Sequence, residues 1–104
     1  MMIRIIASQR SVEIDDPANF RAFSVRIEGR FDDPAVEAEL LGRVAVKSDR
    51  EHAWISELAL RDWPQLKPET WWQDGLTQMI AAVQKFGWID PANHSIRAHI
   101  ERAP

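Results

Sequence analysis

The residues best suited to chemistry lie late in the sequence. Two histidines and two carboxylates occur there in one short segment, namely Asp90, His94, His99 and Glu101. Neutral imidazoles and carboxylates can bind zinc or iron, and a histidine suits general-base catalysis. Their spacing matches no metal-binding motif, and the same residues also fit a solvated loop and strand. A small enzyme or metal-binding protein is therefore an alternative, and the primary expectation is no metal, no cofactor and no catalytic residue.

Other reactive groups are scarce. The chain has no cysteine, which removes disulfides, thiolate nucleophiles and thiolate metal ligands. Its four glycines form neither a phosphate-binding loop nor a dinucleotide fingerprint, and no serine occupies a nucleophile elbow. The sequence alone does not determine the function.

Tryptophan is the most informative residue type. All five tryptophans lie between Trp54 and Trp88, and the chain has no tyrosine. Tryptophan combines a large apolar side chain with one N–H that needs a partner, so such a cluster marks either the core or a contact surface. Trp63 lies in a connecting stretch whose orientation the sequence does not define.

Size and composition are those of one globular domain, residues 1–104. Apolar residues make up 45% and charged residues 28%, unlike the composition of disordered chains. The net charge of −3 argues against a nucleic-acid partner, because nucleic acids are bound by basic surfaces. An acidic protein that neutralises another protein, as immunity proteins do, is a further alternative.

Apolar segments are short throughout the chain. None approaches the roughly 20 residues of a membrane span. The apolar start is interrupted by Arg4 and does not resemble a secretory signal. We expect no membrane partner and, by default, a cytoplasmic location.

The clearest element is an amphipathic helix over residues 68–86. Pro68 suits its first turn, and Gly87 suits a left-handed cap at its end. Trp88 is then expected to fold back on the helix at Val83, as a core residue. The apolar residues recur at three- and four-residue intervals and form one stripe: Trp72, Leu76, Met79, Ile80, Val83 and Phe86.

Gly75 lies inside this helix, where glycine costs about 1 kcal/mol relative to alanine. One interpretation is that a strand or loop approaches closely at this position. The other is that Trp71 and a notch beside Gly75 form a small binding groove. Adjacent helical residues point about 100° apart, so Trp71 faces outward if Trp72 faces the core.

Period-two alternation predicts strands in the first half of the chain. Residues 23–31 alternate between apolar and polar side chains, and residues 36–46 repeat the pattern. A loop over residues 32–35 would join them as a hairpin, with Glu28 opposite Glu39 as its weak point. The same stretch also fits a helix, with Asp33 as N-cap and Pro34 at the first position. The sequence leaves strand or helix open for residues 34–41.

A second hairpin loop is expected at residues 48–51, returning the chain as a strand over residues 52–60. Its outer face would then carry an apolar patch, in which Trp54 lies beside Ala45 and Leu58 beside Leu41. Such patches mark interfaces, where tryptophan is enriched. The predicted partner-binding residues are Trp54, Leu41, Ala45, Leu58 and, separately, Trp71.

The last predicted strand covers residues 95–102, with Ile96, Ala98 and Ile100 facing inward, and another strand is expected near residues 2–8. Together these elements predict the α+β class, with one antiparallel sheet of about four or five strands and the helix packed on one face. A ferredoxin-like layout is compatible with this order. The favoured function is a small non-enzymatic domain that binds a protein partner or a second copy of itself.

Overall fold

A curled, mixed sheet forms the centre of the structure, a computed structural model that describes residues 1–104. Its strands follow the spatial order β2-β1-β3-β7-β5-β4, and the short β6 pairs with β7. The strands are β1 (Met2–Ile6), β2 (Ser11–Asp15), β3 (Ser24–Glu28), β4 (Ala45–Ser48), β5 (His52–Ser56), β6 (Ile89–Asp90) and β7 (Ser95–Ala103).

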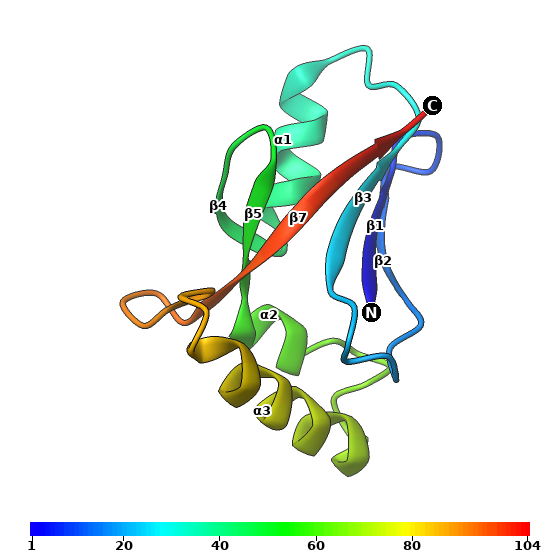
Figure 1. The fold of residues 1–104 in the computed structure, drawn as a ribbon. Helices are drawn as coiled ribbons and strands as arrows, with labels where there is room; N and C mark the ends of the chain where they lie inside the picture. The colour runs from blue at the N-terminus through cyan, green and yellow to red at the C-terminus, as the bar shows by residue number, and fades with distance from the viewer.

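Strand β7 joins the two halves of this sheet. Its second half is parallel to β3, with His99 opposite Ser24, and its first half is antiparallel to β5, with Ile96 opposite Ile55. Figure 1 shows β7 crossing diagonally between the β4–β5 hairpin and strands β1–β3. Because β3 is also parallel to β1, the antiparallel sheet predicted from the sequence is wrong, and a ferredoxin-like layout is not confirmed.

Three helices cover the inner face of the sheet: α1 (Pro34–Gly42), α2 (Glu57–Arg61) and α3 (Thr70–Gln84). Their buried residues join the inward side chains of the strands in one core of 18 residues, so the domain is a small compact α+β unit. No helix is long and apolar enough to cross a membrane. The central core residues include Ile3, Val25, Leu40, Ile55, Leu60, Trp72, Leu76 and Ile96.

The segment after β3 is helical, so the predicted hairpin between residues 23–31 and 36–46 is wrong. Its helical alternative is confirmed, because the Asp33 side chain caps α1 by accepting a hydrogen bond from the Ala35 N–H at 2.9 Å. The helix buries Leu40 and Leu41, two consecutive residues that would point to opposite faces of a strand. Alternation over residues 36–46 is thus coincidental.

Strands β4 and β5 form the second predicted hairpin in a different register. Trp54 pairs with Lys47 and not, as the sequence predicted, with Ala45, because the register shifts between Ala45 and Lys47. After Ser56 the chain enters α2, whose first turn is capped by the Ser56 hydroxyl. The strand therefore ends before Leu58, against the prediction.

The predictions for α3 and β7 are confirmed in their main features. Helix α3 lies within the predicted residues 68–86 and buries Trp72, Leu76 and Met79. However, Phe86 is 57% exposed, because α3 ends at Gln84 and Phe86 no longer lies on its apolar stripe. In β7 the inward residues are buried as expected, namely Ile96, Ala98 and Ile100.

Candidate functional site

The sheet face opposite the helices, here called the outer face, carries polar and aromatic side chains of β5 and β7. Because side chains alternate along a strand, Trp54 and Arg97 point outward from directly paired positions. The next outward pair is His52 and His99, whose rings lie edge to face with centroids 5.8 Å apart.

Aromatic and cationic side chains follow one another from this face to the end of α3. Lys47 Nζ lies 4.8 Å from the Trp54 ring centroid, and Arg97 Cζ lies 5.5 Å from that of Trp88. The Trp88 and Phe86 ring centroids are 5.1 Å apart, and Lys85 Nζ lies 5.2 Å from the Phe86 ring. Cations over aromatic rings attract them electrostatically. We call the set the aromatic–cation row: Lys47, Trp54, Arg97, Trp88, Phe86 and Lys85.

Trp88 reaches this row because the chain reverses after α3. Gly87 has a φ of +74°, in the left-handed region that favours glycine, which confirms the predicted cap. The Trp88 carbonyl then accepts a hydrogen bond from the Arg97 N–H at 2.8 Å. Trp88 lies near Val83 as expected, but it is 36% exposed, so its predicted burial in the core is wrong.

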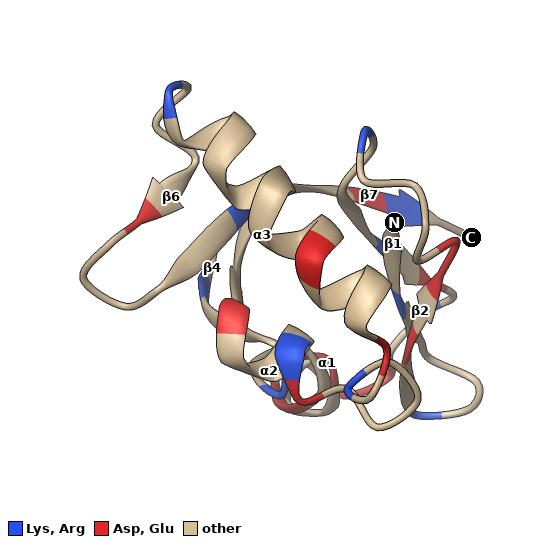
Figure 2. Ribbon diagram, turned by 90° about the horizontal axis from the view of Figure 1, so that it is seen from below, with Lys and Arg blue, Asp and Glu red and all other residues tan.

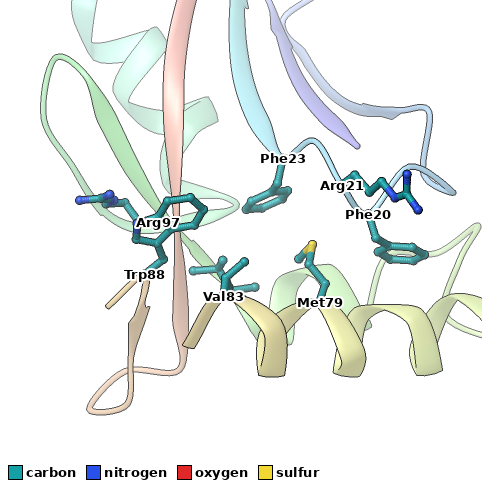
Figure 3. A pocket seen from close by; sticks show the side chains of 8 residues that line it. Phe20, Arg21, Phe23, Met79, Val83, Trp88 and Arg97 are labelled. Atoms are coloured by element: carbon teal, nitrogen blue, oxygen red, sulfur yellow. The ribbon is translucent and has the colours of Figure 1, made fainter. Parts of the chain in front are cut away.

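A small hollow of about 70 Å³ opens beside Trp88, between α3 and the sheet. We call it the Trp88 hollow. Figure 3 shows Phe23 pointing between Trp88 and Met79, with Arg97 and Arg21 on opposite sides and their guanidinium groups directed outward. Its lining is mostly apolar and consists of Phe20, Arg21, Phe23, Met79, Val83, Trp88, Ile96 and Arg97.

A second hollow of about 130 Å³ adjoins the first and opens toward the outer face. The two share Phe23, Trp88 and Arg97, and the second adds His52 and His99. No Asp or Glu lines either hollow. The combined surface is therefore apolar at its centre and cationic at its ends.

The cations around this surface differ in whether a carboxylate neutralises them. Lys47 forms an ion pair with Asp90 at 3.0 Å. That hydrogen bond, followed by one from the Ala92 N–H, holds the pKa of the Asp90 carboxyl below its ordinary value of 3.8. In contrast, Arg21 and Arg97 form no ion pair.

Helix α3 adds almost no charge to the neighbourhood. Its only charged residue is Asp74, and in Figure 2 the ribbon of α3 is uncoloured apart from one acidic turn. Lys85 follows the helix and forms no ion pair. Arg21 and Arg97 are therefore the only charged side chains that line the Trp88 hollow.

The group predicted as an alternative metal or catalytic site is not assembled. Asp90 is paired with Lys47, and His94 lies in the turn before β7 with a φ of +52°. His99 and Glu101 lie farther along β7. No group of three or more His, Cys, Asp or Glu side chains in the structure could hold a metal ion.

The five predicted partner-binding residues are spread over several elements. Leu41 is buried on α1, whereas Leu58 is 68% exposed on α2. Ala45 begins β4, Trp54 lies on the outer face of β5, and Trp71 lies in the first turn of α3 with 51% of its surface exposed. The predicted patch requires one continuous strand face, which the structure does not have. Trp54 alone joins the aromatic–cation row.

Sequence reasoning missed most of the residues around the hollow. Periodicity assigns Trp88 to the core and Arg97 to solvent, and it says nothing about their contact. A usable signal was present at element boundaries, where aromatic residues accumulate. Phe20 and Phe23 precede β3, and Phe86 follows α3.

Comparison with protein-family models, curated proteins and solved structures finds no match for this chain. The aromatic–cation row and the two hollows are the features on which a function can be based.

Proposed function

We propose that this protein is a small non-enzymatic domain that binds a protein partner through the aromatic–cation row and the Trp88 hollow. The observation that carries the proposal is the contact between two exposed aromatic rings, Phe86 and Trp88, which are tilted against each other, with Trp88 also lining a hollow. Exposed clusters of large apolar side chains mark interaction sites. Tryptophan and arginine are enriched among the residues that contribute most to protein binding.

The backbone positions of the surface support the same proposal. Arg97 is fixed within β7, Trp54 lies on the neighbouring β5, and Trp88 is tied to Arg97 through the backbone. Side chains that are already ordered lose less conformational freedom when a partner binds. The backbone that carries Trp54, Trp88 and Arg97 is therefore ordered before a partner binds.

The proposal is tested by comparing Trp88→Ala with Trp71→Ala. Both changes remove an exposed tryptophan, and Trp71 lies at the other end of α3. Tagged wild-type protein and both variants are used to recover partners from the native host, and sedimentation velocity measures self-association. We expect Trp88→Ala to lose the partner or second copy that the wild type binds, and Trp71→Ala to retain it.

Melting curves measured by circular dichroism check that both variants are folded at the temperature of the binding experiment. If Trp71→Ala loses the partner and Trp88→Ala retains it, the site lies at the start of α3 and the proposal is wrong. Unchanged recovery and unchanged sedimentation in both folded variants reject it as well.

A further inference from the structure

We infer that the partner presents an acidic segment with one apolar anchor side chain, and that the anchor enters the Trp88 hollow; this inference rests on the proposed function. The chain has a net charge of −3, yet no carboxylate lines either hollow. An acidic protein with a locally cationic surface is complementary to an acidic partner at that surface only.

Three of the seven cationic side chains that form no ion pair gather at this surface. Six of the 13 Lys and Arg side chains form ion pairs within the chain. Arg21, Lys85 and Arg97 do not, and they surround the same hollow and its aromatic rim. Guanidinium groups bind carboxylates with two parallel hydrogen bonds, which are stronger than neutral ones.

The arrangement of side chains around the hollow indicates where a partner needs apolar groups and where it needs negative charge. Figure 3 places Arg21 and Arg97 on opposite sides, with Phe23, Met79 and Val83 between them. A ligand that fills this space needs an apolar group in the middle and negative charge on both sides. The free volume of about 70 Å³ is well below that of ligand pockets, roughly 300–1,000 Å³, so the hollow has room for one apolar side chain at most.

Arg97 is positioned for this role by its contact with Trp88. Its Cζ lies 5.5 Å from the indole centroid, and the cation–π attraction restricts the guanidinium to one side of the ring. A carboxylate that approaches along Trp88 therefore meets an oriented cation. An anchor side chain in the hollow would contact the other side of the same ring.

The experiment uses the full chain and the acetylated, amidated peptide Glu-Asp-Phe-Asp-Glu, titrated to millimolar concentration and followed by NMR of the five indole N–H signals. We expect the Trp88 signal to shift. Arg97→Gln and Arg21→Gln should each weaken binding about tenfold or more, the loss expected for one charge-assisted hydrogen-bonded pair. Replacing the peptide's phenylalanine with alanine should weaken binding at least as much.

Two controls make the result specific. Arg30→Gln removes an unpaired cation at the opposite end of β3 from Phe23 and should leave the affinity unchanged. The basic peptide Lys-Arg-Phe-Arg-Lys should not bind. The inference of an acidic segment is wrong if the basic peptide binds as tightly as the acidic one, or if millimolar acidic peptide shifts no indole signal. It is also wrong if Arg97→Gln leaves the affinity unchanged, or if Arg30→Gln lowers the affinity as much as Arg97→Gln does.

The outcome is separable from that of the proposed function. If the peptide fails but Trp88→Ala still abolishes partner recovery, the surface binds a partner of different chemistry and only the acidic segment is rejected. If Trp88→Ala recovers every partner of the wild type, the proposed function is rejected, and the inference is rejected with it.

Discussion

The ring of Phe20 occupies the space that a Cβ atom on residue 75 would need, so Gly75 is the point at which the β2–β3 loop meets α3. Of the two interpretations of this glycine, close approach of another segment is confirmed. The ring fills the space beside Gly75, and a binding groove at Trp71 stays a prediction. Phe20 also lines the Trp88 hollow, so the contact supports the candidate site.

Gly75→Ala should lower the free energy of unfolding by about 1 kcal/mol, because an overpacking cost of about 2 kcal/mol exceeds the gain in helix propensity of about 1 kcal/mol. In a Phe20→Ala background the ring is gone, and the same substitution should instead stabilise by about 1 kcal/mol. Urea unfolding of the four proteins measures this change of sign. Additive effects would show that the ring and the glycine are not coupled.

Gly87→Ala and Gly42→Ala form a matched pair. An added Cβ meets no atom within 4 Å at either position, but only Gly87 has a positive φ. Gly87→Ala should destabilise by roughly 1–2 kcal/mol because a left-handed conformation strains alanine. Gly42→Ala, at the last residue of α1, should stabilise by up to about 1 kcal/mol. Thermal unfolding that ranks the two variants in the opposite order would contradict the assigned backbone conformations.

Trp72 should be the tryptophan on which stability depends most. It is fully buried, and its indole N–H donates a hydrogen bond to the Pro17 carbonyl at 3.0 Å. Trp72→Phe should lower the free energy of unfolding by roughly 1–3 kcal/mol, because the partly buried Pro17 carbonyl loses its donor and the smaller ring leaves a gap. The neighbouring exposed Trp71→Phe should change it by less than about 0.5 kcal/mol. Urea titrations of both variants measure the contrast, which disappears if Trp72 is exposed in solution.

Acid should loosen the β4–β5 hairpin. The Asp49 carboxylate accepts hydrogen bonds from the Glu51 and His52 N–H groups, both at 2.8 Å, and these bonds hold its pKa below the ordinary value of 3.8. A lowered folded-state pKa gives stability that is fully present above the unfolded-state value and is lost as the pH falls through the folded-state value. The urea concentration at which half of the protein is unfolded should therefore decrease as the pH is lowered below about 4.

Asp49→Asn tests the origin of that fall. The amide does not titrate, so the variant should be less stable than the wild type at neutral pH and should lose less stability on acidification. Urea titrations of both proteins between about pH 6 and pH 2 provide the comparison. Parallel pH profiles for the two proteins would show that other carboxylates, such as Asp90 with its own lowered pKa, account for the loss.

Local patterns were sufficient to predict the elements with long, uninterrupted periodicity. Helix α3 spans Thr70–Gln84 within the predicted residues 68–86, and β7 spans Ser95–Ala103 against the predicted 95–102. In both, one face is buried over most of its length, so the residue types follow the period of burial. The cap at Gly87 was predictable for the same reason, since only glycine adopts its φ at little cost.

Short segments and distant pairings could not be predicted in this way. The alternating residues of α1 also fit a strand, and the capping residue Asp33 is the local feature that favours the helix. The parallel pairing of β3 with β1 and β7 depends on contacts between residues far apart in the chain, which no local period records. The candidate site is of this kind, because Phe23, Trp88 and Arg97 meet only after β7 is in place.

Because β7 lies in the middle of the sheet, the edges of β3 and β5 stay unpaired until β7 has been synthesised. All of the other strands leave the ribosome before β7, and until it arrives β3 and β5 each lack their neighbour on one side. Such unpaired strand edges are templates for aggregation with other chains. The nascent chain thus passes through an interval in which this sheet has two open edges, and β7 alone closes both.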